Sequence, residues 1–119
     1  MMSATLSSAY AADDPSIKGD LRENIKQSMA SFIQQQTIDG EMYVYDAVDG
    51  QLLSLTLDKL HSGIVKKGDF YVSCADFEDE KGRKIDVDFM VRQSAGQWVT
   101  TQALIHSVAG HKRKYHLEK

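Results

Sequence analysis

The sequence predicts an α+β fold, in which one N-terminal amphipathic helix packs on a curved antiparallel β-meander of about five strands. Two patterns predict it. Apolar residues recur every three to four positions as far as Ile33, and from Glu41 onward apolar and polar residues alternate between glycine-bearing turns. The composition, 42% hydrophobic and 26% charged over 119 residues, is typical of a globular domain with one core.

The first residues of the chain are uncharged and mostly small. Ala9-Tyr10-Ala11 fits the small-x-small pattern of a signal-peptidase site, although the basic and apolar regions of a signal peptide are missing. We interpret residues 1–11 as a signal-peptide remnant or a disordered N-terminus, and residues 12–119 as one domain of a periplasmic or secreted protein. The alternative is the flexible terminus of a cytoplasmic protein. Outside the cytoplasm the single cysteine should be buried, or paired between chains.

The helix is predicted from a one-sided apolar stripe. The stripe consists of Ile17, Leu21, Ile25, Met29, Phe32 and Ile33. Asp14, directly before a proline, suits the N-cap, and Asp20 offers a second start of the capping-box type. The Asp-Gly pair at 39–40 is a stop signal, so we expect the helix to end by Thr37.

Glycine-bearing turns divide the rest of the chain into five predicted strands. They cover residues 41–47, 51–60, 69–79, 83–93 and 97–108. In the first hairpin we prefer a two-residue turn, which pairs Val44 with Leu55; a three-residue loop would instead pair Tyr43 with Leu55.

The later hairpins have registers that can be derived from their loops. A three-residue loop with Gly82 in the left-handed conformation sets Phe77 opposite Ile85. A similar loop in the last hairpin sets Val91 opposite Val99. Both registers place the large apolar side chains on one inner face, which we expect the helix to cover.

In this order of elements, residues 14–108 resemble the cystatin-like superfamily, which includes the nuclear-transport-factor-like group. The resemblance implies a helix-on-sheet roll; because the superfamily hosts inhibitors, ligand-binding modules and enzymes, it implies no single function. The inhibitory loop of cystatins, Gln-x-Val-x-Gly, is approached by Gln97 to Thr101, where the glycine is missing, so we do not expect protease inhibition. Cys-Ala-Asp-Phe at 74–77 with Asp-Val-Asp-Phe at 86–89 is also similar to small exported bacterial proteins of unknown function.

The predicted registers leave five large apolar side chains on the outer face of the last three strands. They are Phe70, Val72, Met90, Trp98 and Leu104. An exposed apolar patch of this kind marks a partner or ligand surface. We therefore expect a small exported, non-enzymatic binding module whose partner is an unknown protein, a small ligand or a second copy of the chain docked through the sheet.

The same outer face carries an acidic cluster. Asp76 is predicted opposite Asp86, with Asp88 two residues on and opposite Cys74. Like charges that face each other destabilise a sheet, so a divalent cation, a basic partner segment or a raised carboxyl pKa should compensate them. The alternative is a solvated acidic face. Asp76, Asp86 and Asp88 are thus candidate metal ligands, and a divalent-metal-binding protein or weak enzyme with the same roll is the alternative function.

The remaining patterns predict no chemistry. The four histidines lack a ligand spacing and are expected to be separate surface residues, and although Cys74, His61 and Asp76 make a nucleophilic set on paper, no turn motif aims the cysteine. We therefore expect no catalytic residues and no cofactor. The basic tail at 111–116 is too small for a nucleic-acid site and should be a solvated extension or an extra edge strand. No apolar run reaches the roughly 18 residues of a membrane span.

Overall fold

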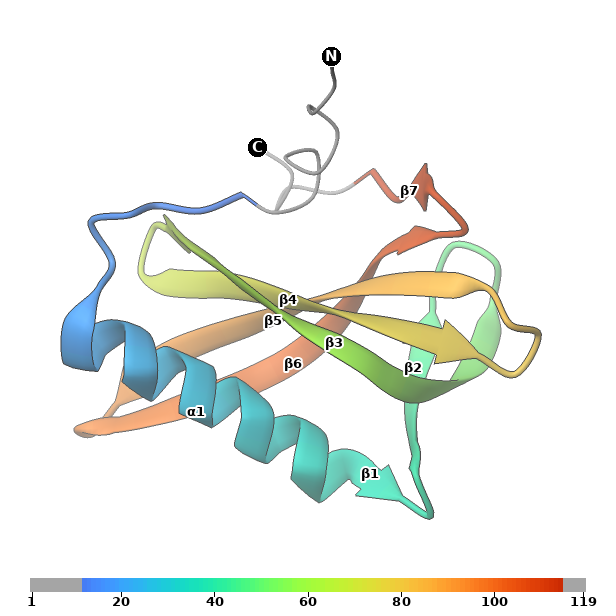
Figure 1. The fold of residues 1–119 in the computed structure, drawn as a ribbon, viewed down its shortest axis with the longest axis horizontal. Helices are drawn as coiled ribbons and strands as arrows, with labels where there is room; N and C mark the ends of the chain where they lie inside the picture. The colour runs from blue at the N-terminus through green and yellow to red at the C-terminus, as the bar shows by residue number, and fades with distance from the viewer. Residues whose placement is uncertain (1–11, 115–119) are drawn as a thin grey trace.

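The computed structural model describes residues 12–114, which form one helix and an antiparallel sheet (Figure 1). The elements, in chain order, are α1 (Gly19–Gln36), β1 (Thr37–Ile38), β2 (Glu41–Asp46), β3 (Gln51–Lys67), β4 (Phe70–Asp79), β5 (Lys84–Ser94), β6 (Gln97–Val108) and β7 (His111–Lys112). The strands follow one another in the sheet in sequence order, so the sheet is a simple meander. The proposed signal remnant at 1–11 and the end of the basic tail lie outside the described residues.

The predicted fold class is wrong in its proportions. The single helix and the antiparallel order are present, but the sheet has seven strands and accounts for 58% of the described residues against 17% for the helix, so the fold is mostly sheet. Strands β1 and β7 have two residues each, too few to show an alternating pattern. Strand β3 continues to Lys67, well past the predicted end at residue 60.

Helix α1 lies across one face of the sheet (Figure 1) and buries Ile25, Met29 and Ile33 there. It begins at Gly19, with Lys18 at the N-cap position, and Asp14 does not cap it. The Asp14 carboxylate instead accepts hydrogen bonds from the backbone N–H and the hydroxyl of Ser16, at 3.0 and 2.8 Å. The helix ends before Thr37, as expected. No helix within residues 12–114 is long and apolar enough to cross a membrane.

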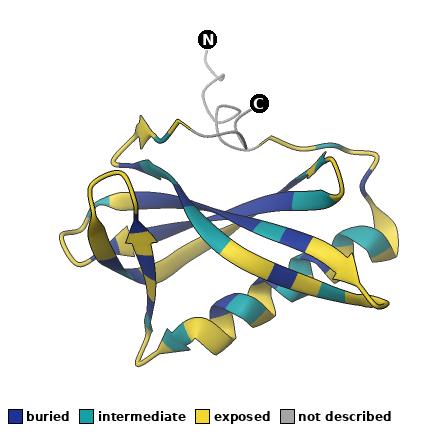
Figure 2. Cartoon of the chain, turned by 180° about the vertical axis from the view of Figure 1, so that it is seen from behind, coloured by how far each residue is buried: buried dark blue, intermediate teal, exposed yellow. Residues whose placement is uncertain are grey.

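The central strands are buried on both faces, as the dark blue stretches in Figure 2 show. In β4 every residue from Val72 to Phe77 is buried, and in β5 every residue from Ile85 to Phe89. On the helix side this burial is the apolar core. On the other side it encloses polar side chains, which a solvated outer face would have left exposed.

The β4–β5 register is confirmed. Phe77 pairs with Ile85 across the predicted three-residue loop, and Gly82 has a φ of 78°, in the left-handed region. Both alternatives for the first hairpin are wrong, since a four-residue loop pairs Val44 with Leu53.

The predicted β5–β6 register is also wrong. The turn has two residues, Ala95 and Gly96, and Val91 pairs with Thr100 rather than Val99. Because the side-chain period of a strand is two, this shift exchanges the faces of neighbouring residues. Trp98 therefore lies on the helix side of the sheet, where its ring meets Tyr71 edge-on at 5.8 Å between centroids.

Candidate metal centre

Two of the four β-bulges that flank the central pair of strands carry a histidine. In β3, Leu60 pairs with Ala75 and Ile64 with Ser73, so the three residues that begin with His61 stand opposite the single residue Cys74. In β6, Ile105 and Ser107 pair with adjacent residues of β5, so His106 is an extra residue. A bulge re-aims the side chain that it carries. Each of these two bulges presents a histidine to the outer face of β4 and β5.

Six side chains meet on this outer face, and we call them the bulge cluster. They are His61, Cys74, Asp76, Asp86, Asp88 and His106. Four of them form a square on two adjacent strands, in which Asp76 pairs with Asp86 and Cys74 with Asp88. All are buried except His106, which is half-buried.

Asp76 and Asp88, at opposite corners of the square, are hydrogen-bonded to the two histidines. His61 Nε2 lies 2.9 Å from Asp76 Oδ1. His106 Nδ1 lies 3.1 and 3.0 Å from the two oxygens of Asp88. Cys74 and Asp86 occupy the other two corners, and their ligand atoms lie within 4.8 Å of each other.

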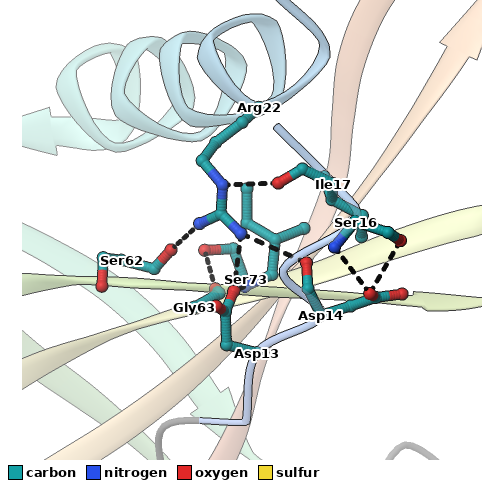
Figure 3. A network of polar contacts seen from close by, with 9 residues as sticks. Asp13, Asp14, Ser16, Ile17, Arg22, Ser62, Gly63 and Ser73 are labelled. Carbon is teal, nitrogen blue, oxygen red and sulfur yellow. Dashed lines mark hydrogen bonds and ion pairs between the residues drawn. The ribbon is translucent and has the colours of Figure 1, made fainter. Parts of the chain in front are cut away.

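The His61 bulge is fastened to the start of the helix by Arg22 (Figure 3). The guanidinium donates hydrogen bonds to the carbonyl of Ser62 and, at 2.6 Å, to the carboxylate of Asp13. That hydrogen bond lowers the pKa of Asp13. The Ser73 hydroxyl donates to the carbonyl of Gly63 at 3.0 Å, so both carbonyls that follow His61 are bound. The position of His61 is therefore held from both sides of the bulge.

The cluster has an excess of negative potential. Burial raises the pKa of the Cys74 thiol far above its usual value, and Asp86, Asp88 and Asp76 raise it further. Burial also raises the pKa of Asp86 to about 6, against the opposing effect of His106 and with the help of Asp88 and Asp76. Asp86 Oδ1 is buried and accepts no hydrogen bond from any described residue. An unsatisfied buried oxygen is costly, so a positive group at this point would stabilise the fold.

Three donor atoms of different kinds converge here. The ligand-capable atoms of His61, Cys74 and Asp86 all lie within 4.8 Å of one another. Nitrogen, thiolate sulfur and carboxylate oxygen together are the donor set of Zn²⁺. Asp76 Oδ1 lies 2.9 Å from His61 Nε2 and holds the imidazole ring in the cluster, as carboxylates commonly do for metal-binding histidines.

The predicted acidic cluster is thus brought together, but with changed roles. Of the three predicted metal ligands, Asp76 and Asp88 are hydrogen-bonded to histidines. Asp86 Oδ2 lies 4.0 Å from His106 Nδ1, and an oxygen of Asp86 lies within 4.8 Å of the donor atoms of Cys74 and His61. The expectation of separate surface histidines is wrong for His61 and His106. Of the other two, His111 is exposed and His116 lies outside the described residues. The sequence indicated only that His61 lies near the end of a predicted strand. The bulge that directs His61 into the cluster on the outer face has no sequence signature.

The predicted apolar patch is divided between the two faces. Phe70, Val72, Met90 and Leu104 share the outer face in the observed registers, whereas Trp98 lies on the helix side. Val72 is buried and the other four are half-buried. Binding of a partner, or dimerisation, through this face stays a prediction. Cys74 is buried, which is one of the two arrangements expected of the single cysteine outside the cytoplasm, and export itself stays a prediction.

No protein-family model, curated protein or solved structure matches the chain. The resemblance in element order to the cystatin-like superfamily therefore stays a prediction.

Proposed function

We propose that the protein binds a divalent transition-metal ion, with Zn²⁺ as the best match, through His61, Cys74 and Asp86. The observation that carries the proposal is the convergence of one nitrogen, one sulfur and one oxygen donor within 4.8 Å in a buried site. Asp76 and Asp88 are positioning residues, which hold His61 and His106 by their hydrogen bonds.

The electrostatics favour a cation over a solvated acidic face. A solvated carboxylate satisfies its oxygens with water, but only 6% of Asp86 is exposed and its Oδ1 has no partner among residues 12–114. Binding a metal would replace the thiol proton of Cys74 and give Asp86 a counter-charge in one step. The same negative potential that keeps the thiol protonated attracts the metal.

The main competing chemistry is a cysteine nucleophile. Cys74, His61 and Asp76 supply the residue types of such a set, and the histidine is oriented by the carboxylate at 2.9 Å. A nucleophilic cysteine, however, needs a depressed pKa and access to substrate, whereas Cys74 is buried and its pKa is raised. The site is therefore better suited to hold a metal than to attack a substrate.

Hard cations fit less well. Calcium takes six to eight oxygen ligands, and magnesium also prefers oxygen. Two of the three carboxylates are bound to imidazoles, and the central donors include sulfur and nitrogen. We therefore expect little binding of Ca²⁺ or Mg²⁺.

Calorimetric titration of chelator-treated protein with Zn²⁺ tests the proposal. We expect one equivalent to bind, with affinity reduced at least tenfold in Cys74→Ser, His61→Gln and Asp86→Asn. His111→Gln and Asp58→Asn replace exposed residues of the same types and should leave the affinity unchanged. Equal binding by site and control variants would locate the metal elsewhere, and no binding by the unmodified protein would overturn the proposal.

A further inference from the structure

A cavity of about 220 Å³ adjoins the bulge cluster on the outer face. Asp76, Asp86 and His106 line it from the cluster side, and Lys84 and Lys112 line it from the ends of β5 and β7. A water molecule occupies about 30 Å³ in the liquid, so the cavity has room for a small ligand. Asp86 belongs to both the cavity wall and the candidate donor set, so a ligand in the cavity would lie beside a metal held by Asp86.

The charges of the cavity depend on the metal. Without a cation, two carboxylates on the cluster side oppose the two lysines, and an anion would meet Asp86 directly. A divalent ion held by Asp86, the Cys74 thiolate and His61 would neutralise the charges of its own ligands, so an oxyanion could coordinate the ion while Lys84 and Lys112 attract it from the other end of the cavity. Lys84 also pairs across the strands with Glu78, which is exposed to solvent and so screened more strongly than a charge inside the cavity.

The donor set leaves a place for such a ligand. Zinc bound by three protein side chains keeps a fourth, open position in its tetrahedral coordination, as in sites that exchange water for another ligand. Of the three donors, Asp86 is the one that lines the cavity. A small carboxylate or phosphate in the cavity could reach both the metal and a lysine ammonium.

Resting on the proposed metal binding, we infer that this cavity is a site for a small oxyanion, which binds together with the metal and is held on its other side by Lys84. The coupling is reciprocal: the factor by which the anion raises metal affinity equals the factor by which the metal raises anion affinity. A measurement of metal affinity therefore reports anion binding.

The test measures the Zn²⁺ affinity of the protein by competition with a chelator at constant ionic strength. Sodium perchlorate is the reference salt. In the test samples, sodium acetate or inorganic phosphate replaces part of the perchlorate. Control titrations with chelator alone correct for zinc complexed by each anion. We expect acetate or phosphate to raise the affinity of the protein at least fivefold. The anion that raises the zinc affinity more shows whether the cavity prefers a carboxylate or a phosphate.

Variants distinguish the cavity from general charge effects. Lys84→Met should abolish the anion effect and leave zinc affinity in perchlorate within about twofold of the unmodified protein. Lys81→Met removes an exposed lysine of the same hairpin that does not line the cavity, and it should retain the effect. Zinc binding with no anion effect, or with an effect that Lys84→Met retains, overturns the anion site and leaves the metal site standing. Failure of zinc to bind at all overturns both.

Discussion

Arg113 and Asp46 form an ion pair across 67 positions of sequence, with Nη2 2.6 Å from Oδ2. The same nitrogen lies 3.3 Å from Asp49 Oδ2. Because Arg113 directly follows β7, the pair fastens the C-terminal hairpin to the first hairpin of the sheet. That C-terminal hairpin carries Gly110 and Lys112, which line the cavity beside the bulge cluster.

Arg113→Gln should lower the free energy of unfolding by about 3 to 5 kcal/mol, because it leaves the buried Asp46 carboxylate without its counter-charge. Urea denaturation measures the change. Asp49→Asn should cost less than about 1 kcal/mol, since the Asp49 side chain is half exposed at 51%. Equal losses in the two variants would show that the ion pair with Asp46 is not what fastens the hairpin.

The observed β5–β6 register predicts different effects of substitution on neighbouring residues. Phe89→Ala should cost about 3 to 5 kcal/mol, because the ring is fully buried. Thr100→Ala should cost about 1 kcal/mol, because Thr100 is a buried residue whose hydroxyl lies 2.9 Å from the Ser28 hydroxyl. Val99→Ala should cost no more than about 0.5 kcal/mol, because Val99 is exposed. A Val99→Ala cost above that of Thr100→Ala would restore the register derived from sequence.

Asp79 should make stability depend on pH. Burial alone would raise the pKa of its carboxyl, but hydrogen bonds from the backbone and side chain of Arg83 and the backbone of Lys81 outweigh burial and lower the pKa. A lowered folded-state pKa favours the ionised form. The stabilisation that the ionised Asp79 carboxylate gives to the folded state is therefore fully present above the unfolded pKa of about 3.9. It is lost as the pH falls through the lower pKa of the folded state.

Asp79→Asn should accordingly destabilise the protein by about 1.5 to 3 kcal/mol at neutral pH, the usual range for hydrogen bonds to a charged group. The difference from the unmodified protein should shrink as pH falls below about 3. Urea denaturation at both pH values measures it, with Asp58→Asn as the exposed control. A difference that does not change with pH would show that the ionised carboxylate is not the stabilising form.

Asp86→Asn should have opposite effects in the absence and presence of zinc. In chelated protein at pH 8 it removes a buried charge whose pKa is raised to about 6, so it should stabilise the fold by about 1 to 3 kcal/mol. Excess Zn²⁺ should raise the melting temperature of the unmodified protein, and it should raise the melting temperature of the variant much less. Stabilisation of the variant under both conditions, by equal amounts, would mean that Asp86 is a tolerated charge and not a ligand.

The parts of the fold that sequence predicted correctly are those determined by local pattern. The apolar stripe located the helix, and the loop that contains Gly82 determined the β4–β5 register and with it the facing pair Asp76 and Asp86. The two-residue strands at the ends of the sheet left no such pattern.

The histidines of the site could not be placed from sequence, because a bulge is a property of two paired strands. An extra residue such as His106 changes the face of every residue on one side of it and leaves composition and alternation almost unaltered. The three-residue bulge at His61 depends further on Arg22, which binds it from the helix, far away in sequence. Only Cys74 and the three aspartates, which lie in the regularly paired segment of β4 and β5, could be placed from the length of the connecting loop.

The most direct test of the metal site is the absorption spectrum of chelated protein loaded with Co²⁺, which substitutes for zinc and reports its own ligands. A thiolate–cobalt charge-transfer band in the near ultraviolet, saturating at one equivalent, with visible bands of tetrahedral intensity, is the predicted result. The charge-transfer band should disappear in Cys74→Ser and persist in His111→Gln. Absence of this band from the unmodified protein, or its persistence in Cys74→Ser, would contradict the assignment of Cys74 as a metal ligand.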